Sequence, residues 1–463
     1  MSQAITDTLQ TRLAAIVGDK HVLGEDKIQL RDHGWCEHSQ RAKLLVRPAS
    51  KEELSEVAKL ATEMGVKLVA QGGLTGLVDA TTTEPDNVIV STERLNKIIR
   101  VDPLQNVLIA EAGVTLAKAH AAAAEHGLTL GVDIPSRDSC TLGGIVSTNA
   151  GGIRVIRYGM TRENVLGLNA VMSDGTIVEA DNTLMKNNAG YDLKHLFIGS
   201  EGTLGMVTSV VFKLFTKPVR EHTALVAAKS SDDLLQLLSR CRRDVGSALL
   251  SFEGLWEDFY MGKTQAAGIR APIEEAYPVY GIIEGGVWRA GENANPLEEV
   301  LSVALEDGLI ADAVMASSES ERREIWDIRE NGEPLSMYGK NLQSFDVGFE
   351  LNDIAPFVTR LKERMAQSWP DKPVFVFGHI GDGNLHIVLA NNDEEHARRT
   401  EFSEVLYDVT SEFANSTVSA EHGIGLEKKQ YLSHSRSPEQ VQVMQRLKAA
   451  MDPASMLNAG KIF

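Results

Sequence analysis

Helix-like and strand-like patterns of apolar and polar residues alternate along the whole chain. Residues 50–53 (S-K-E-E) form a capping box, and apolar positions then recur every three or four residues up to Gly65, which predicts a short amphipathic helix. The V-K-L-V-A run that follows predicts a strand. N-P-L-E at 295–298 predicts the start of a helix that ends at Gly308, and S-P-E-Q at 437–440 predicts the start of the last helix. Because both periodicities recur, we expect a protein that mixes helices and strands.

The length of the chain indicates more than one domain. A chain of 463 residues, 43% of them hydrophobic, exceeds one ordinary core, so two or three domains are expected. The strand-like run K-L-F-T-K-P ends at Pro218 and closes the first part. We therefore expect a domain over 1–219, a second over 220–415 and a C-terminal segment over 416–463.

Charge and cysteine content restrict the partners and the compartment. The net charge of -18 argues against nucleic acid or an anionic membrane as the main partner, and an anionic substrate would need local cations. Cys36, Cys140 and Cys241 are widely spaced and odd in number, which favours a reducing compartment. No signal-like or membrane-spanning apolar run is seen in the sequence, so we expect a cytoplasmic protein, with peripheral membrane attachment left open.

Four side chains with catalytic chemistry follow strand-like runs near the end of the chain. His379 follows the strand-like run 373–378, a turn comes next, and His386 lies at the start of L-H-I-V-L-A, which predicts a hairpin with both imidazoles at one end. A third short strand over 416–420 would deliver Glu421 and His422. Two histidines and a carboxylate can bind a divalent metal with open positions, and His422 is placed to move a proton. The same set could hold iron in an oxygenase, so the chemistry stays open here.

Three glycine-rich segments in the first half suit a phosphate-bearing cofactor. They are Q-G-G-L-T-G at 71–76, the segment 135–159 with two glycine pairs, and G-S-E-G-T-L-G at 199–205. Closely spaced glycines let backbone N–H groups approach a phosphate, and small residues leave little side-chain bulk to fill a core. The spacing misses G-x-G-x-x-G, so a nicotinamide site of the Rossmann type is disfavoured.

These motifs, with N-A-G-Y-D-L at 188–193 and the C-terminal H-I-G-D-G-N-L-H and S-A-E-H-G, occur in the order typical of one family. The chain resembles the FAD-dependent D-2-hydroxyacid dehydrogenases of the vanillyl-alcohol oxidase superfamily. The resemblance runs from about residue 40 to Phe463. It implies an α+β fold with a two-part FAD-binding domain of the PCMH type, an α+β substrate-binding cap domain, and a C-terminal segment that returns to the FAD domain.

The resemblance implies that the glycine segments hold FAD. No histidine lies in or beside the first glycine loop, so we expect the flavin to be bound non-covalently. The expected FAD-binding residues are Gln71, Gly72, Gly73, Leu74, Thr75, Gly76, Pro135, Asp138, Thr141, Gly143, Gly144, Ser147, Thr148, Asn149, Gly151, Gly152, Tyr158, Gly159, Glu201, Gly202, Val207 and Asn458.

The resemblance also narrows the chemistry of the C-terminal motifs. A 2-hydroxy acid can chelate one metal through its hydroxyl and carboxylate, which lowers the pKa of the hydroxyl. His379, His386 and Glu421 would be the ligands of zinc or manganese, between which ligand type cannot choose. His422 would take the hydroxyl proton as the C2 hydride passes to flavin N5.

The substrate pocket departs from the pattern of the family. Arg329 matches an arginine that binds the substrate carboxylate, and Asn384 is a further candidate for substrate binding. The D-2-hydroxyglutarate enzymes carry a threonine and a lysine downstream of this arginine, where this chain has Glu333 and Ser344. Lys340 lies nearby as a substitute cation. We therefore expect a D-2-hydroxy acid such as D-lactate, with D-2-hydroxyglutarate and other D-2-hydroxy acids as alternatives.

Three other functions stay open: a metal-independent flavin oxidase or synthase of the same superfamily, an iron oxygenase, and a non-catalytic flavoprotein subunit. The sequence contains no nicotinamide motif, haem-binding C-x-x-C-H or iron–sulfur cysteine cluster. Electrons would therefore leave to a separate acceptor such as a quinone or an electron-transfer flavoprotein. A homodimer is also left open.

Overall fold

The computed structural model describes residues 3–32, 34, 40–266, 269–289, 291 and 295–463. Cys36 lies outside this part of the chain, whereas Cys140 and Cys241 are buried free thiols. Burial raises the pKa of Cys140 to about 11 and that of Cys241 to about 12, so both are held as neutral thiols.

The chain divides into two compact units. Unit 1 comprises Met1–Gly152, Tyr158–Lys217 and Glu421–Phe463, and unit 2 comprises Ile153–Arg157 and Pro218–Ala420. The sequence did not predict that residues 153–157 belong with the second unit. Within the described residues, no helix combines the length and apolar content needed to cross a bilayer.

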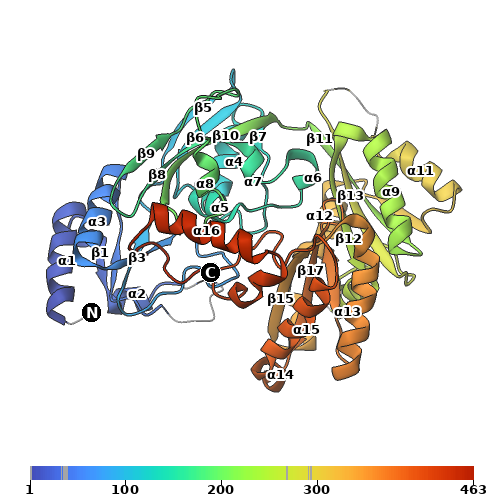
Figure 1. Cartoon of the computed structure of the whole chain (residues 1–463). Helices are drawn as coiled ribbons and strands as arrows, with labels where there is room; N and C mark the ends of the chain where they lie inside the picture. Colours follow the sequence, from blue (N-terminus) through green and yellow to red (C-terminus); the bar gives the residue numbers. More distant parts are fainter. Residues whose placement is uncertain (1–2, 33, 35–39, 267–268, 290, 292–294) are drawn as a thin grey trace. The chain divides into compact units, whose positions relative to one another are not determined.

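Unit 1 contains two sheets (Figure 1). The first has the order β1-β2-β4-β3, in which β2, β4 and β3 are parallel, and the second has the order β5-β6-β10-β8-β9 with β7 paired to β10, all antiparallel. The strands are β1 (Val22–Gly24), β2 (Leu44–Val46), β3 (Lys67–Gln71), β4 (Asn87–Ser91), β5 (Ile98–Asp102), β6 (Val107–Glu111), β7 (Leu128–Leu130), β8 (Val165–Val171), β9 (Ile177–Ala180) and β10 (Met206–Thr216). The helices are α1 (Gln3–Val17), η1 (Asp19–His21), α2 (Glu25–Gln29), α3 (Lys51–Met64), α4 (Leu116–Ala124), α5 (Leu142–Thr148), α6 (Val155–Tyr158, whose last residue belongs to unit 1), α7 (Thr161–Asn164), α8 (Lys194–Phe197), η5 (Lys429–His434) and α16 (Pro438–Met451).

Local signals set the ends of α3 and α16 as the sequence predicts. The Ser50 side chain accepts a hydrogen bond from the N–H of Glu53, and Gly65 ends α3 with φ of 64°. α16, red in Figure 1, begins with the complete capping box of Ser437 and Gln440. Nζ of Lys448 on α16 donates to the carbonyl oxygens of Thr203 and Leu457, at 2.7 and 2.9 Å, and so holds α16 against the rest of unit 1.

Unit 2 is an antiparallel sheet of order β14-β11-β13-β12-β16-β17-β15 covered by helices on both faces. The strands are β11 (Arg220–Ala228), β12 (Leu249–Trp256), β13 (Val279–Val287), β14 (Asp312–Met315), β15 (Asn341–Gly348), β16 (Phe375–Gly378) and β17 (Asn384–Asn391). The helices are α9 (Ser231–Asp244), η2 (Gly246–Ala248), α10 (Glu257–Ala266), α11 (Glu298–Glu306), α12 (Glu319–Glu330), η3 (Glu333–Tyr338), η4 (Leu351–Asp353), α13 (Ile354–Ser368), α14 (Asp393–Ala397) and α15 (Arg399–Ser411).

Alternation along β13 separates the two faces of this sheet. Tyr280 and Ile282 pack into a core with residues of α10 and α12, whereas a Cβ placed on Gly281 would lie 2.8 Å from Leu234 of α9. α9 and α11 therefore lie on one side of the sheet and α12 on the other (Figure 1). We call the side covered by α10 and α12 the α12 face.

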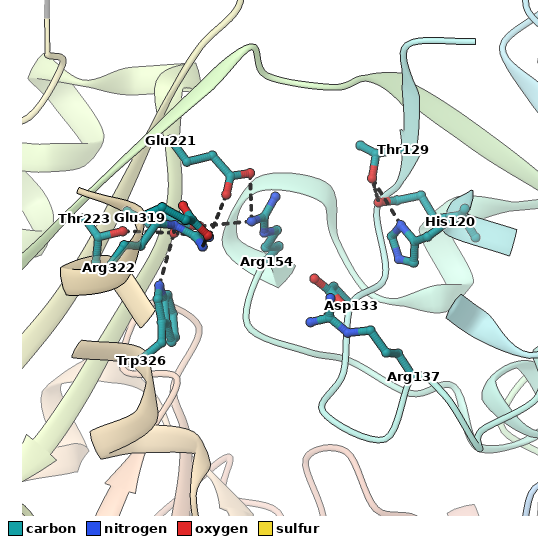
Figure 2. A network of polar contacts seen from close by, with 12 residues as sticks. His120, Thr129, Asp133, Arg137, Arg154, Glu221, Thr223, Glu319, Arg322 and Trp326 are labelled. Carbon is teal, nitrogen blue, oxygen red and sulfur yellow. Dashed lines mark hydrogen bonds and ion pairs between the residues drawn. The ribbon is translucent and has the colours of Figure 1, made fainter. Parts of the chain in front are cut away.

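A buried ion network fastens residues 153–157 into unit 2. Arg154 lies 2.9 Å from Glu221 and 3.0 Å from Glu284, and Arg322 binds the same two carboxylates, as Figure 2 shows for Arg154, Glu221 and Arg322. Trp326 also donates to Glu284, at 3.1 Å. Burial raises the pKa of Glu284, and the neighbouring Glu221 raises it further, so the two arginines are needed to hold charge there.

The hairpin predicted around His379 and His386 is confirmed, since β16 and β17 are an antiparallel pair. The predicted third strand over 416–420 is wrong. Thr417 makes only an isolated bridge with Gly348. Its side chain instead accepts from the N–H of Ser419 at 3.2 Å and donates to the Ser419 carbonyl at 2.9 Å, and such local bonds compete with a strand ladder.

Candidate functional site

The first two glycine segments contact each other in unit 1. A Cβ on Gly72 would lie 2.3 Å from Oγ1 of Thr141, and a Cβ on Gly73 would lie 1.9 Å from the carbonyl oxygen of Ser139. Any larger residue would push these segments apart. Among the described residues, the buried Oγ1 of Thr141 has no hydrogen-bond partner, which suits a hydroxyl that faces a cofactor.

The end of the second segment lies beside the C-terminal motif. A Cβ on Gly151 would lie 2.5 Å from Oε1 of Glu421, so glycine is required for Glu421 to approach this close. Gly152 has φ of 150°, and its Cβ would lie 2.1 Å from the carbonyl oxygen of Asp133. Unit 1 thus holds Glu421 against a segment predicted to bind FAD.

Glu201 organises the third segment. It is buried, and its carboxylate accepts from the N–H groups of Ile424 and Gly425 at 2.7 and 2.8 Å. Burial outweighs these hydrogen bonds and raises the pKa of Glu201. Its carbonyl oxygen accepts from Asn458, which also binds the N–H of Ala70. Glu201 and Asn458 therefore connect the glycine segments to the loop that carries Glu421 and His422.

The other predicted FAD-binding residues occupy varied positions in unit 1. Gln71 is buried and bonded to Gln40, and Leu74 has φ of 55°. The remaining ones fall into three groups by exposure. The exposed residues are Pro135, Asp138 and Gly76. The half-buried residues are Thr75, Gly144, Ser147, Thr148, Asn149 and Gly159, and the buried residues are Gly143, Tyr158, Gly202 and Val207.

In unit 2, the α12 face carries a row of polar groups across three strands. Antiparallel pairing places Phe377 of β16 opposite His386 of β17, and Asp346 of β15 opposite His386 on its other side. Residues paired in this way point to the same face of a sheet. Asp346 has no exposed surface, and Oδ2 accepts from Ser419 at 3.1 Å. His386 therefore lies beside a buried carboxylate.

His379 is held directly beyond β16 by a second buried carboxylate. Nδ1 of His379 lies 2.7 Å from Oε1 of Glu253, and Nε of Arg329 donates to Oε2 of the same carboxylate at 2.9 Å. Nη2 of Arg329 lies 3.3 Å from Nε2 of His379. Burial raises the pKa of Glu253, but His379 and Arg329 outweigh burial and hold its pKa below the ordinary value. Glu253 is therefore a buried, ionised group shared by two side chains.

The two histidines of unit 2 are close enough to bind one ion. Their ring centroids are 5.2 Å apart, and their potential ligand atoms lie within 4.8 Å of each other. Asn384, on the same strand and face as His386, is buried, and within the described part of the chain neither its side-chain oxygen nor its nitrogen has a partner. Such an unsatisfied amide indicates a group that faces a ligand.

Lys340, the predicted substitute cation, lies away from this cluster directly before β15, whereas Ser344 shares the α12 face with Asp346. Lys340 is exposed and ion-paired with Asp393 at 2.8 Å, at the end of the strand opposite to Gly348. Ser344 is exposed and pairs with Val388. Arg329 and Asn384 are thus beside His379 and His386, whereas Lys340 is engaged elsewhere.

In unit 1, His422 follows Glu421 in a loop that turns around Glu201. Gly423 and Gly425 have φ of 88° and 52°, so the chain turns directly after His422 in a conformation that favours glycine. A Cβ on Gly423 would lie 2.8 Å from Oε1 of Glu201. Both Glu421 and His422 are half-buried.

The sequence did not single out Glu253, Asp346 or Glu284. Each is fully buried. Glu253 and Glu284 lie in largely apolar strand runs, L-L-S-F-E-G-L-W and V-Y-G-I-I-E-G-G-V, and Asp346 lies in the buried end F-D-V-G of its strand. A charged residue in such a run is rarely buried without a partner, which is the signal that could have identified them.

Two family models and several relatives match most of this chain. Residues 42–181 match the model of an FAD binding domain, and residues 217–462 match that of the C-terminal domain of FAD linked oxidases. D-2-hydroxyglutarate dehydrogenase of Xanthomonas citri pv. viticola is 37% identical over 427 residues, covering 90% of this chain and 88% of the relative. The mitochondrial D-2-hydroxyglutarate dehydrogenase of Bos taurus is 35% identical, covering 91% of this chain and 77% of the relative.

Solved structures of lower identity share the fold. p-Cresol methylhydroxylase superposes with a TM-score of 0.76 at 15% identity, over 99% of this chain and 96% of the other. Alkyldihydroxyacetonephosphate synthase superposes with a TM-score of 0.75 at 17% identity, over 100% of this chain and 86% of the other. The expected α+β fold with an FAD-binding domain of the vanillyl-alcohol oxidase type is confirmed. The chain belongs to the FAD-dependent D-2-hydroxyacid dehydrogenase family, and it is an oxidoreductase that acts on a CH–OH group.

Proposed function

We propose that the protein oxidises a D-2-hydroxy acid to the 2-oxo acid, with D-2-hydroxyglutarate as the first candidate substrate. The names of the similar proteins support this substrate. The observation that carries the proposal is the buried cluster of Arg329, His379, His386 and the unsatisfied Asn384 on one face of unit 2.

D-lactate is the second candidate, because the chain lacks an obvious cation for a distal carboxylate. Glu333 and Ser344 occupy the positions at which the D-2-hydroxyglutarate enzymes are expected to carry threonine and lysine. The nearby Lys340 is exposed and paired with Asp393. A substrate with one carboxylate would need no such cation.

Residues of unit 1 and unit 2 fit the two expected cofactors. The glycine contacts around Thr141 suit non-covalent FAD, and the buried imidazoles of His379 and His386 suit a divalent ion. We propose that Glu421 completes the ligand set and that the ion is zinc or manganese. FAD supplies a hydride acceptor, and a divalent cation supplies polarisation of the substrate hydroxyl.

Each side chain then has a distinct role. Arg329 binds the substrate carboxylate through the Nη side of its fork, since Nε is bonded to Glu253. Asn384 donates to or accepts from a substrate oxygen, which would satisfy its buried amide. His422 takes the proton of the substrate hydroxyl. General-base catalysis of this kind typically contributes about 10²- to 10⁴-fold to the rate.

We further propose a cytoplasmic enzyme that passes electrons to a separate quinone or electron-transfer flavoprotein. The scattered cysteines support a reducing compartment, and the sequence has no motif for a second redox group. Acceptor reduction in extracts that contain each carrier would distinguish the two.

Anaerobic mixing with a panel of D- and L-2-hydroxy acids tests the proposal. Bleaching of the flavin by D-2-hydroxyglutarate at lower concentration than by D-lactate supports the first substrate, and the reverse order supports the second. A His422→Ala variant should retain FAD and lose bleaching. Bleaching by L-isomers alone would refute the stereochemistry. Full activity after metal removal would favour the metal-independent oxidase, and a purified protein without flavin would favour the iron oxygenase.

A further inference from the structure

The carboxylate of Glu253 is the feature of unit 2 that links two parts of the proposed centre. Glu253 has no exposed surface and lies on β12, facing α12. Oε2 accepts from Nε of Arg329 at 2.9 Å, and Oε1 lies 2.7 Å from Nδ1 of His379. One side chain therefore contacts both the arginine proposed to bind substrate and a histidine proposed to bind the cation.

The partners of His379 specify its tautomer. A carboxylate can only accept a hydrogen bond and a guanidinium can only donate one. Nδ1 faces Glu253, so it carries the proton, and Nε2 faces Nη2 of Arg329 at 3.3 Å, so it carries the lone pair. If Nε2 carried the proton, its N–H would point at an N–H of Arg329 and neither group could accept. These contacts place a proton on Nδ1 and the lone pair on Nε2, the tautomer in which an imidazole binds a cation through Nε2.

The contact of Glu253 with Arg329 explains why residue 253 carries a carboxylate. Nε of Arg329 and Nδ1 of His379 both donate, so they require two acceptor atoms in one side chain. A glutamine amide offers one acceptor and one donor and can satisfy only one of them. The guanidinium of Arg329 also lies over the ring of Phe377, at 5.3 Å from its centroid, which is a second contact that orients it.

We propose that Glu253 is the positioning residue of the proposed centre, which holds His379 in its cation-binding tautomer and Arg329 in the orientation that presents Nη to a carboxylate. The inference rests on the proposed function. A carboxylate behind a metal-binding histidine typically contributes about 10- to 100-fold to metal affinity.

The test is cation binding by Glu253→Gln, which keeps the size of the side chain. Full-length protein with FAD bound is stripped of metal and titrated with Zn²⁺ and Mn²⁺ by calorimetry. We expect the variant to bind about 10- to 100-fold more weakly than the unchanged protein. It should keep its FAD, because the glycines of the three segments lie in unit 1.

Glu284→Gln is the matched control. Glu284 is equally buried on the same face of the sheet, and within the described part of unit 2 its side chain binds Arg154, Arg322, Thr223 and Trp326 and no histidine. We expect this variant to lose stability and keep its cation affinity. A general loss of packing would lower the affinity in both variants.

The outcomes separate this inference from the proposed function. Equal cation affinity in Glu253→Gln and the unchanged protein, or an equal loss in Glu284→Gln, overturns the role of Glu253 and leaves the proposed function standing. If the unchanged protein takes up neither cation, the metal part of the proposed function fails as well. A raised KM for the 2-hydroxy acid in Glu253→Gln, with FAD reduction by dithionite unchanged, supports the contact to Arg329.

Discussion

Lys263 is a buried lysine whose charge opposes the folded state of unit 2. It lies on α10 with 1% of its surface exposed, and its ammonium donates to the carbonyl oxygen of Asn331, directly after α12. Burial lowers its pKa from 10.5 to about 8, with Asp327 acting in the opposite direction and Arg329 in the same direction as burial. The unfolded chain therefore binds a proton at Lys263 between about pH 8 and 10.5 that the folded chain does not.

The difference between the folded and unfolded pKa of Lys263 sets the sign and size of its effect on stability. Where the unfolded state binds more protons, stability rises with pH. At about 1.36 kcal/mol per pKa unit, the fall from 10.5 to about 8 corresponds to about 3 kcal/mol. Below pH 8 both states are protonated and the contribution is constant. Between pH 8 and 10.5 the unchanged protein gains up to about 3 kcal/mol of unfolding free energy from Lys263. We expect Lys263→Met to lack this gain, so the unfolding free energy of the variant minus that of the unchanged protein falls by the same amount over this range.

Urea unfolding followed by tryptophan fluorescence can measure this. Four of the five tryptophans, at 256, 288, 326 and 369, lie in unit 2, so the signal reports mainly on that unit. Lys229→Met, at an exposed lysine of the same unit, controls for the loss of a charge. A difference between Lys263→Met and the unchanged protein that stays constant from pH 8 to 10.5 would refute the reasoning.

Three further substitutions test other contacts. Glu284→Leu removes the buried carboxylate that Arg154 and Arg322 share and leaves Glu221 to neutralise both, so it should destabilise unit 2 by about 3 kcal/mol in the same urea assay; a loss below about 1 kcal/mol would contradict this. Gly73→Ala would place a Cβ 1.9 Å from the carbonyl oxygen of Ser139, so the purified protein should lack flavin absorbance, and full FAD content would show that the loop adapts. Asn384→Ala should raise KM for the 2-hydroxy acid about tenfold with FAD content and stability unchanged, and an unchanged KM would exclude substrate contact.

The parts of the structure that depend on local signals could be predicted from the sequence. Ser50 and Gly65 set the ends of α3, and the hairpin of β16 and β17 follows from two apolar runs around a glycine-containing turn. The strand expected over 416–420 failed for an equally local reason. Thr417 bonds to the backbone of Ser419 with its own hydroxyl, an alternative that β-propensity does not register.

The partners of the candidate site could not be predicted, because they are distant in the sequence. Glu253 meets His379 only after β12 and β16 pair, across 126 positions, and meets Arg329 only after α12 covers this face. Arg154 likewise finds Glu284 across 130 positions. Periodicity identifies which face of a strand is buried, but it does not identify the element that covers that face.

The buried charges of unit 2 also bear on why an acidic protein could bind an anionic substrate. Around His379 and His386, the formal charges of Glu253 and Asp346 are negative, and Arg329 supplies one positive charge that Glu253 already binds. With neutral histidines these groups of unit 2 sum to a charge of minus one, and the proposed ligand Glu421 makes it minus two. A divalent cation would bring the sum to zero and so remove the repulsion of an anionic substrate. We therefore expect binding of the 2-oxo acid product, measured by calorimetry, to require Zn²⁺ or Mn²⁺ and to weaken with added salt. Equal product binding before and after metal removal would show that Arg329 alone is sufficient.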